Sequence, residues 1–518
     1  MQTTSNDQRP TNNENMRSEL TTILKSTYTK ATAKNFDVGR RDFIKKSAMA
    51  SVAFSLPLAG CSNSKSSKPT LAIIGGGIAG LTAAYQLKKN GIDCTVYEAS
   101  NRTGGRVLTV PDGVVQGSHI DLGAEYVDSI HDDLIALSKE LNVELLDMRP
   151  DKLIPKVYYF EGKMMSEKDI VDALQPFAER LAQDVNSIPD MHYSNADAFR
   201  ALDEQSITSY LKSIGVNGWL LTFLEMAMVG EYAMEAHEQS AINLLHMLAV
   251  PIIYSEHYHT LGDYHEVFKF KGGSHSFTKA LSAQVEDRVK LGRQLKTLNK
   301  VDEGYELIFD INGTKETIKA DYVLLALSVG VLRKLEMNFS FPERKKRWIE
   351  EAGMGNAVKV AMGFNKRVWR EMGYQGYTFT DVNVTEFWDS SLLVDITAGS
   401  LTFAGGGEVG KEFAILSNSE IRERWLTGAD KIFPGLAVQH NGKLAKFVWQ
   451  TYPFTNGSYV SYKPGQWSAF AGVEAEPFEN ILFAGECCSI EHQGYMNGAA
   501  ETGRKAAEEI VKRLSVKS

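Results

Sequence analysis

The sequence is short of cysteine and has no surplus of positive charge, and each shortage excludes a class of protein. Four of the 518 residues are cysteines, too few for the disulfide framework of a small secreted domain. The 56 lysines and arginines are outnumbered by 64 aspartates and glutamates, so the net charge is −8 at pH 7. Because binding to nucleic acid phosphates requires clustered positive charge, we expect no nucleic acid as a partner.

Long hydrophobic runs are also scarce, and one short run near the N-terminus predicts processing. Residues 47–60, SAMASVAFSLPLAG, are 14 uncharged residues, fewer than the ~20 that a membrane-spanning helix needs. They follow the basic segment RRDFIKK at 40–46. A short apolar run after a positive region is typical of a cleaved segment, and paired arginines are read by an export receptor. We therefore predict a twin-arginine signal region at 1–60 and a polar tether at 61–68.

The end of that run indicates where the mature chain begins. Residues 58–61, LAGC, resemble a lipobox, in which the cysteine is lipidated and becomes the new N-terminus. Lipidation of Cys61 would anchor the protein to a membrane in the periplasm or elsewhere in the cell envelope. The alternative is a chance arginine pair before a weak anchor helix.

Residues 70–100, TLAIIGGGIAGLTAAYQLKKNGIDCTVYEAS, are typical of a dinucleotide-binding unit. They predict a strand, a helix and a second strand at 71–74, 81–89 and 95–97. Gly75 permits a tight turn, Gly77 lets the backbone approach a pyrophosphate, and Gly80 allows the helix and strand to pack closely. Glu98 can accept hydrogen bonds from an adenosine ribose. The alternative is a glycine-rich turn in another kind of α/β unit.

The next residues favour FAD over NAD as the dinucleotide. Residues 98–107, EASNRTGGRV, resemble the E-A-x-x-R-x-G-G-R signature of the flavin-containing amine oxidase family. In that family this loop approaches the FAD phosphates and the flavin, and an arginine fork suits a pyrophosphate. The resemblance implies FAD contacts from four residues, with Arg102 in support: Ala99, Gly104, Gly105 and Arg106.

The C-terminal residues resemble the other half of the family's FAD site. ILFAGECC at 481–488 and GYMNGAAETGRKAAEEI at 494–510 resemble F-A-G-E and G-Y-M-E-G-A with a closing helix. The resemblance implies that Glu486 contacts the ribityl and phosphate region. It also implies that Met496 and the helix start face the flavin pyrimidine ring, where a positive helix end favours reduced flavin. The segment RQLKTL, which resembles the family's adenine-side strand, implies a contact from Leu295.

A lysine in an apolar segment is the first catalytic candidate. Lys359 lies in GMGNAVKVAMGFNKRVW at 353–369, between two valines. An isolated charge is costly to bury, so a buried lysine needs a partner or a chemical role. The family resemblance implies that Lys359 bonds through water to flavin N5 and handles protons during flavin oxidation and reoxidation. The alternative is a strand lysine that points to solvent.

Aromatic residues are the other catalytic candidates. FVWQTYPFTNGSYVSYKPG at 447–465 resembles the flavin-facing segment of monoamine and polyamine oxidases. By that resemblance Tyr459 and Tyr495 form the walls of an aromatic cage, and Trp449 lies near the flavin. Two facing rings hold an amine nitrogen without solvating charge, so they favour the neutral, hydride-donating form. Ser458 stands where some monoamine oxidases carry a flavin-linking cysteine, so we expect non-covalent FAD.

The expected substrate class depends on the loop DLGAEYVDSIH at 121–131. It resembles the family's D-x-G-A-x-W-x loop in front of the flavin, which brings Gly123 to the cofactor. Asp128 falls where a plant polyamine oxidase has a substrate-anchoring glutamate, and Glu125 flanks it. Residues 121–139 contain no arginine that could clamp a carboxylate. An acidic pocket mouth formed by Asp128 and Glu125 would favour a cationic primary amine or polyamine over an amino acid.

Two other functions stay open. An L-amino acid oxidase on the same fold would need a carboxylate clamp elsewhere, from Arg367 or Arg370. A flavin-loaded lipoprotein could carry electrons, although a carrier has no need of an aromatic cage. The electron acceptor is either oxygen or a periplasmic protein. The histidines in 255–268 could hold a metal, but we favour a polar lid there and expect no metal site.

Together the motifs predict an α/β fold of two interleaved domains. A Rossmann-type FAD-binding domain would comprise 69–150, 268–330 and 470–514, and an α+β substrate domain would comprise 151–267 and 331–469. Because the FAD site needs both ends of the chain, FAD is loaded before export, which requires a route for folded proteins. The expected reaction transfers hydride to flavin N5, and the imine is hydrolysed to an aldehyde plus ammonia or a shorter amine.

Overall fold

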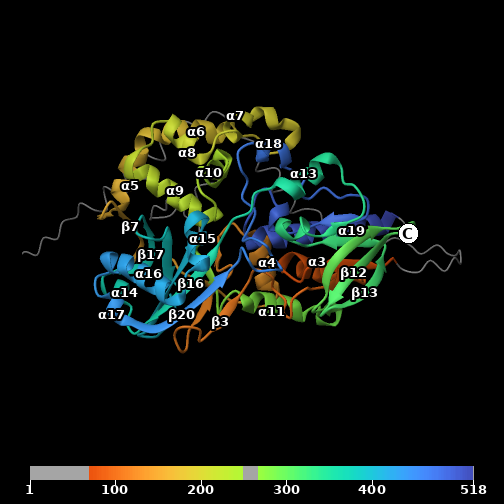
Figure 1. Cartoon of the computed structure of the whole chain (residues 1–518), viewed down its shortest axis with the longest axis horizontal. Coiled ribbons are helices and arrows are strands. Elements are labelled where there is room, and N and C mark those ends of the chain that lie inside the picture. The colour runs from red at the N-terminus through yellow and green to blue at the C-terminus, as the bar shows by residue number, and fades with distance from the viewer. Residues whose placement is uncertain (1–68, 249–265, 517–518) are drawn as a thin grey trace, which may run out of the picture.

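The computed structural model describes residues 69–248 and 266–516, which form two halves side by side (Figure 1). One half contains a parallel sheet and the long C-terminal helix α19 (Met496–Val516), and the other contains a larger mixed sheet. The predicted signal region, the tether and His257, His259 and His265 lie outside the described residues. No helix within the described ranges is long and apolar enough to cross a membrane.

The first half is built on a five-stranded sheet in the order β10-β2-β1-β14-β21, and all neighbouring strands are parallel. Its strands are β1 (Leu71–Ile74), β2 (Thr95–Tyr97), β10 (Val289–Lys290), β14 (Tyr322–Leu325) and β21 (Ile481–Phe483). Every residue of β1, β14 and β21 is buried, as expected for parallel strands covered on both faces. The predicted strands at 71–74 and 95–97 are confirmed. Because β14 pairs with both β1 and β21, the sheet joins distant segments of the chain.

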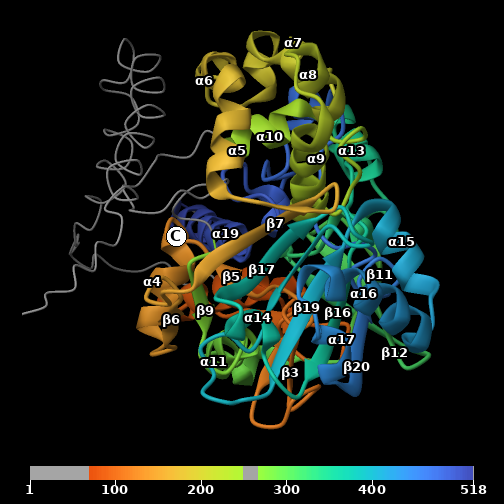
Figure 2. The ribbon, with the colours of Figure 1, turned by 90° about the vertical axis from the view of Figure 1, so that its left-hand side faces the viewer.

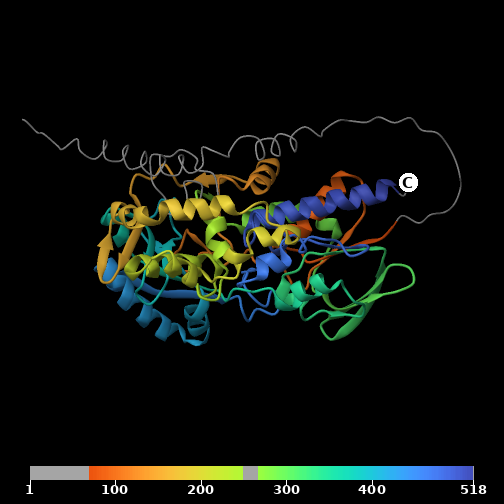
Figure 3. The same cartoon turned by 90° about the horizontal axis from the view of Figure 1, so that it is seen from above.

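Helices α3 (Ile78–Lys89) and α19 pack against each other beside this sheet, and α19 is the long blue helix of Figure 3. A side chain at Gly503 of α19 would lie 2.3 Å from the Ala79 carbonyl oxygen of α3, so the helix backbones are in close contact. The helix predicted at 81–89 is confirmed, but it begins earlier, at Ile78, because Gly80 continues its first turn.

The second half is built on a seven-stranded sheet in the order β20-β16-β19-β18-β17-β7-β8. Its strands are β7 (Ile154–Phe160), β8 (Lys163–Met165), β16 (Val358–Phe364), β17 (Tyr374–Thr380), β18 (Glu386–Asp389), β19 (Gly399–Gly405) and β20 (His440–Val448). Lys359 of β16 is opposite Ala404 on one side and Phe447 on the other. This central position explains its apolar neighbours in the sequence.

Helices cover both faces of the larger sheet. The helical layer at the top of Figure 2 consists of α5 (Glu167–Leu174), α6 (Ala178–Ser187), α7 (Arg200–Asp203), α8 (Ile207–Ser213), α9 (Gly218–Tyr232) and α10 (Ala241–Leu248). It shares a core with Tyr158 and Phe379, whereas α15 (Gly407–Ile415) and α16 (Asn418–Ile432) share another with Val358 and Val360. Because side chains alternate along a strand, Lys359 points away from those valines.

Three smaller sheets complete the described fold. They have the orders β13-β12-β11-β15, β5-β9-β6 and β3-β4. Their strands are β3 (Thr109–Pro111), β4 (His119–Asp121), β5 (Tyr126–Val127), β6 (Leu145–Asp147), β9 (Phe268–Phe270), β11 (Gln294–Lys300), β12 (Tyr305–Ile311), β13 (Thr314–Ala320) and β15 (Glu336–Met337). β15 pairs with β11, so residues 336–337 extend the four-stranded sheet. The domain limits stay a prediction.

Candidate active site

The turn after β1 accepts only glycine at two of the predicted positions. Gly75 has a φ of +110°, and a side chain there would lie 2.4 Å from the Ala326 carbonyl oxygen. A side chain at Gly80 would lie 2.0 Å from the Gly75 carbonyl oxygen. Gly77 is the N-cap of α3, and no side chain of the described residues caps this helix. The first amides of α3 are therefore available to an anion such as a pyrophosphate.

The second glycine loop lies against this turn. The Gly104 amide donates to the Gly76 carbonyl oxygen at 2.8 Å. A side chain at Gly105 would lie 3.4 Å from the Gly77 Cα atom. The two loops therefore meet through backbone atoms, which lets a ligand approach both.

The acid predicted to bind a ribose is held at this turn. Glu98 follows β2, and its Oε2 atom accepts a hydrogen bond from the Gly76 amide at 2.7 Å. Its Oε1 atom accepts from the Ser100 amide at 2.8 Å. Ala99 beside it is half-buried, and Leu295 of β11 packs against the same apolar core as β2. These positions fit the adenosine side of a dinucleotide.

The two arginines of the loop have different surroundings. Arg102 donates to the carbonyl oxygens of Gly105 at 2.7 Å and Val107 at 2.8 Å, so it supports the loop from within. The backbone of Arg106 lies close to Gly123. A side chain added at Gly123 would lie 2.0 Å from the Arg106 carbonyl oxygen. Gly123 therefore brings the loop at 121–131 to the predicted FAD-binding residues.

An ion pair joins three distant segments at this place. Arg106 Nη1 donates to Glu486 Oε1 at 2.7 Å and to the Ser458 carbonyl oxygen at 2.6 Å. Glu486 also accepts from the Gly494 amide at 2.9 Å and from the Val460 amide at 3.3 Å. The structure thus brings the N-terminal motif, the C-terminal motif and the aromatic segment together.

Buried polar groups beside this ion pair fit an extended polar ligand. Within the described residues, neither the Ser458 hydroxyl nor the side-chain amide of Gln493 has a hydrogen-bond partner. Met496 begins α19 three residues after Gln493 and is buried. These groups, with the open glycine turn and the uncapped α3, suit a ligand as long and as polar as FAD.

Lys359 is paired with Glu125 inside the protein. Its Nζ atom donates to Glu125 Oε2 at 3.0 Å and to the Asp121 carbonyl oxygen at 3.3 Å. Glu125 also accepts from Lys269 Nζ at 2.8 Å and from the Trp388 indole at 2.9 Å. Its side chain is 1% exposed. Glu125 is therefore not part of an open acidic mouth, which corrects our prediction.

The charges of this cluster follow from its contacts. Burial opposes ionisation of Glu125, but the two lysines outweigh burial and lower its pKa to about 2. Burial and the charge of Glu125 raise the pKa of Asp121 to about 6. Burial acts to lower the pKa of Lys269, but Glu125 raises it above the ordinary value. An anionic Glu125 thus lies between two lysines.

Asp128 does not line an open mouth either. It is 4% exposed, and its Oδ1 atom accepts from the Glu266 amide at 2.8 Å. Its Oδ2 atom lies 3.6 Å from His131 Nε2, and its amide donates to His131 Nδ1 at 3.0 Å. These contacts show Asp128 holding a buried turn, so the prediction that it lines an acidic pocket mouth is corrected as well.

The two predicted cage tyrosines are fixed by adjacent residues of α9. The Tyr459 hydroxyl donates to the Gly230 carbonyl oxygen at 3.4 Å. The Tyr495 hydroxyl donates to the Glu231 carboxylate. Both rings are partly exposed rather than fully enclosed. The end of α9 therefore brings together the two aromatic residues that the sequence placed in separate motifs.

Trp449 lies near the strand that carries Lys359. Its indole donates to the Leu122 carbonyl oxygen at 2.7 Å. Its ring is 4.4 Å from the ring of Phe447, which is opposite Lys359 in the sheet. Trp449 thus connects the loop at 121–131 to β16 and β20.

A further carboxylate beside the tyrosines was not predicted from the sequence. A side chain at Gly230 would lie 2.7 Å from Glu386 Oε1, and Glu386 Oε2 accepts from the Tyr377 hydroxyl at 3.0 Å. Burial, together with the charges of Glu266 and Glu231, raises the pKa of Glu386 to about 8. Two acidic groups are therefore present at this site, but they come from β18 (Glu386) and α9 (Glu231).

One sequence signal could have identified several of the missed residues. Lys269 lies in FKF at 268–270, and Glu386 and Trp388 lie in EFWD at 386–389. Lys269 is a charged residue between two phenylalanines, the same feature that drew attention to Lys359, and Glu386 and Trp388 lie in a buried strand with two acidic residues. Which charges pair could not be read from the sequence, because the partners lie in four separate elements.

The arginines required by an L-amino acid oxidase are engaged elsewhere. Arg367 donates to the carbonyl oxygens of Val394 at 3.0 Å and Ile396. Arg370 donates to Asp151 at 2.8 Å. Neither arginine is placed to clamp a substrate carboxylate without losing these bonds.

Known proteins are similar to this chain in sequence and in fold. A family model described as flavin containing amine oxidoreductase matches residues 78–511. The flavin-containing amine oxidase of Oncorhynchus mykiss is 26% identical over 454 residues, which cover 85% of each chain. Flavin-containing amine oxidase B of Homo sapiens is 24% identical over 466 residues, which cover 86% of each chain.

Two solved structures have a similar fold. A putrescine oxidase bound to putrescine superposes with a TM-score of 0.76 at 21% identity, over 86% of this chain and 99% of that one. A cyclohexylamine oxidase from Brevibacterium oxydans gives 0.75 at 20% identity, over 86% and 100%. The predicted fold class is thus confirmed, and the family implies FAD as the cofactor. The chain belongs to the flavin-containing amine oxidoreductase family and is an oxidoreductase.

Proposed function

We propose that the protein catalyses FAD-dependent oxidative deamination of a primary amine or polyamine. The main support is the pair of tyrosines, Tyr459 and Tyr495, fixed by adjacent residues of α9 beside the carboxylates of Glu231 and Glu386. Nearby carboxylates attract an organic ammonium, and the aromatic faces hold the amine once it is neutral. The names of the similar putrescine and cyclohexylamine oxidases support an amine substrate as well.

The chain would hold FAD with the glycine turn, Glu98, Arg106, Glu486 and the start of α19. When bound, FAD accepts a hydride from the carbon next to the amine nitrogen and later passes two electrons to an acceptor. We propose non-covalent binding, because Ser458 stands at the position where some relatives have a linking cysteine. Acid denaturation should then release all of the flavin, and flavin retained in the pellet would contradict this.

The carboxyl group of Glu386 can handle the substrate's proton. Burial, with the charges of Glu266 and Glu231, raises its pKa to about 8, so it exchanges a proton near neutral pH. An ammonium that enters beside an ionised Glu386 can transfer its proton to the carboxylate. The rings of Tyr459 and Tyr495 then hold the neutral amine, because they do not solvate a charge.

The products follow from the balance of atoms. A neutral primary amine that gives up a hydride and a proton becomes an imine. Water adds to the imine carbon, and the carbon–nitrogen bond breaks to give an aldehyde and ammonia. A substrate with a secondary amino group releases a shorter amine instead of ammonia.

Lys359 would act after the amine is oxidised. Its ammonium is held by Glu125 and the Asp121 carbonyl oxygen and has a third donor N–H group. We propose that this donor places a water molecule at the cofactor and supplies a proton when the flavin is reoxidised.

An L-amino acid oxidase is less well supported. That reaction needs a cation for the substrate carboxylate, and Arg367 and Arg370 are both bonded to other groups. The carboxylates of Glu231 and Glu386 would repel the carboxylate of such a substrate.

We also propose that the folded protein is exported by the twin-arginine route and anchored through a lipid on Cys61. Either oxygen or a periplasmic electron carrier would then accept the electrons. The sequence RRDFIKK followed by LAGC supports this proposal.

Product analysis tests the proposed reaction. The purified holoprotein is mixed with an amine and oxygen, and aldehyde, ammonia and consumed amine are measured. We expect one aldehyde and one ammonia for each primary amine consumed. Release of a 2-oxo acid from an amino acid, with no aldehyde from any amine, would overturn the proposal.

A further inference from the structure

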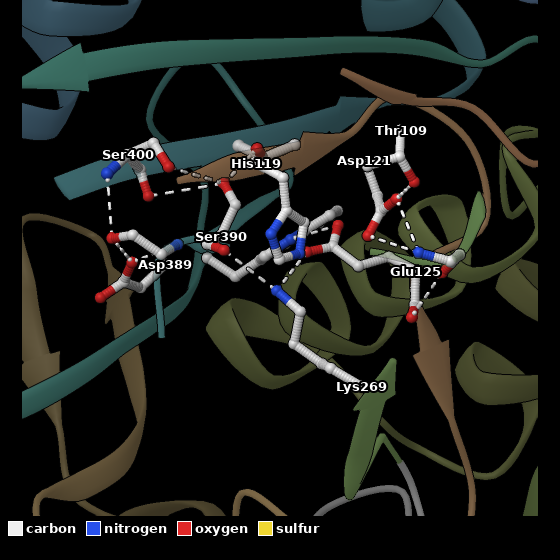
Figure 4. A network of polar contacts seen from close by, with 12 residues as sticks. Thr109, His119, Asp121, Glu125, Lys269, Asp389, Ser390 and Ser400 are labelled. Atoms are coloured by element: carbon white, nitrogen blue, oxygen red, sulfur yellow. Dashed lines mark hydrogen bonds and ion pairs between the residues drawn. The ribbon is translucent and has the colours of Figure 1, made fainter. Parts of the chain in front are cut away.

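A buried chain of three charges lies beside the site described above. Lys269 of β9, Glu125 of the loop between β4 and β5, and Lys359 of β16 are joined by the two ion pairs at Glu125. Their side chains are 4%, 1% and 12% exposed. Figure 4 shows Lys269 directed towards Glu125, with Asp121 nearby. In the proposed reaction Lys359 acts at the cofactor, whereas Glu125 and Lys269 take no direct part.

We propose that Glu125 is the positioning residue of Lys359 and that Lys269 in turn fixes Glu125. The proposal rests on the proposed function in one respect, namely that Lys359 acts when the flavin is reoxidised. Glu125 itself acts only through Lys359.

The donors of Lys359 support this role. A lysine ammonium has three N–H groups. Two are used by Glu125 Oε2 at 3.0 Å and by the Asp121 carbonyl oxygen at 3.3 Å. The Trp388 ring centre lies 4.7 Å from Nζ and covers another side. These contacts fix the direction of the third N–H group, so Glu125 helps to determine where Lys359 can offer a proton.

Glu125 is itself fixed at both of its oxygens. Oε1 accepts from Lys269 Nζ, which also donates to the Ser390 carbonyl oxygen at 3.1 Å. Oε2 accepts from the Trp388 indole at 2.9 Å as well as from Lys359. The carboxylate cannot rotate without breaking one of these bonds. Lys269 therefore provides the rigidity that a single Glu125–Lys359 pair would lack.

Charge balance determines which variants are informative. Removing one partner of a buried ion pair destabilises a protein, because it leaves an uncompensated charge. Glu125→Gln leaves Lys269 and Lys359 without their shared carboxylate. The double variant Glu125→Gln/Lys269→Met restores the net charge of the cluster. It therefore serves as the second variant if the single variant does not fold.

The experiment separates positioning from structural support. The holoprotein is photoreduced without oxygen, with oxalate as the electron donor so that no amine is present, and its reoxidation by dissolved oxygen is followed by absorbance. We expect Lys359→Met and Glu125→Gln each to slow reoxidation by on the order of 10-fold or more, because a misplaced group loses its reactive geometry. Glu125→Gln added to Lys359→Met should change the rate less than about two-fold, since both act through one group.

The exposed pair Lys271–Glu144 provides matched controls. Its Nζ–Oε2 distance is 2.8 Å and both side chains are more than half exposed. Lys271→Met and Glu144→Gln should reoxidise as the wild type does. Flavin content and melting temperature are measured for every variant. If the role of Glu125 were merely structural, Glu125→Gln would lower both values and would also slow reoxidation of the Lys359→Met variant further.

Three results would overturn the proposal. The first is that Glu125→Gln, or its charge-balanced double variant, is reoxidised at the wild-type rate. The second is that Glu125→Gln slows reoxidation further when it is added to Lys359→Met. The third is that the reduced wild type does not react with oxygen. Because photoreduction needs no substrate, the positioning role of Glu125 and the proposed amine reaction can be overturned independently of each other. A flavin that no amine reduces would overturn the amine reaction while the predicted reoxidation rates would still support Glu125.

Discussion

Lys359 lies inside a sheet, and segments far away in the chain supply its partners. Its neighbours along β16 are buried valines. Its Nζ atom donates to Glu125, which lies in a loop more than 200 residues earlier in the chain. Glu386 illustrates the opposite case. Burial and the nearby carboxylates raise its pKa, although the Tyr377 hydroxyl donates to it, so its proton is retained to a higher pH.

Glu386→Gln should remove a pH-dependent loss of stability. Burial and the charges of Glu266 and Glu231 raise the pKa of Glu386 from 4.5 to about 8, and Lys156 opposes this in part. Between these values the folded protein keeps a proton that the unfolded chain has released. The free energy of unfolding therefore falls as the pH rises through this range. The melting temperature of the wild type should fall relative to that of Glu386→Gln.

The control for this measurement is an exposed glutamate. Glu408 has a side chain that is 70% exposed, so Glu408→Gln should follow the wild type at every pH. A difference between the wild type and Glu386→Gln that is constant from about pH 5 to about pH 8 would show that Glu386 has an ordinary pKa.

At the scale of elements, the contact between α3 and α19 links the two ends of the FAD site. A side chain at Gly503 would lie 2.3 Å from the Ala79 carbonyl oxygen, so Gly503→Ala must push the helices apart. We expect a loss of ~1–3 kcal/mol in the free energy of unfolding, because overpacking forces backbone shifts. Flavin content should fall as well, since both helices begin at the proposed FAD site.

Denaturant unfolding and flavin absorbance of Gly503→Ala measure these two effects. Lys512→Ala, at an exposed position of the same helix, is the control and should match the wild type. Full stability and full flavin content in Gly503→Ala would mean that the helices separate without cost.

Local elements were predictable from the sequence, and side-chain partners were not. The strand at 71–74 and the glycines after it follow from short patterns, because a tight turn and a close helix contact need glycine at fixed spacings. The acidic pocket mouth of Asp128 and Glu125 was predicted from a family resemblance, because Asp128 falls where a plant polyamine oxidase has a substrate-anchoring glutamate and Glu125 flanks it. Their partners, Lys269 and Glu266, come from a distant segment whose approach no local pattern indicates.

At the scale of the whole molecule, the proposed FAD site is assembled from segments far apart in the chain. Arg106 bonds to Glu486 and to the Ser458 carbonyl oxygen, and β21 joins the sheet started by β1 through β14. A cofactor held in this way cannot bind before the chain is complete. This arrangement could be predicted because each of the three motifs resembles one family, whereas the acids of α9 and β18 belong to none of them.

Replacement of the arginine pair tests the proposed export. Arg40→Lys/Arg41→Lys should leave yellow, folded protein in the cytoplasm, because the export receptor reads the arginines. Cys61→Ala should instead be exported but released from the membrane fraction. Cell fractionation with flavin fluorescence checks both. Wild-type distribution of the arginine variant would rule out this route.

The central claim, oxidation of an amine at the tyrosine pair, is tested most directly by anaerobic mixing. The oxidised holoprotein is mixed with putrescine, spermidine, an aryl amine or L-amino acids without oxygen, and the flavin absorbance is followed. We predict that at least one amine bleaches the flavin and that no amino acid does. Bleaching by L-amino acids alone would contradict the claim.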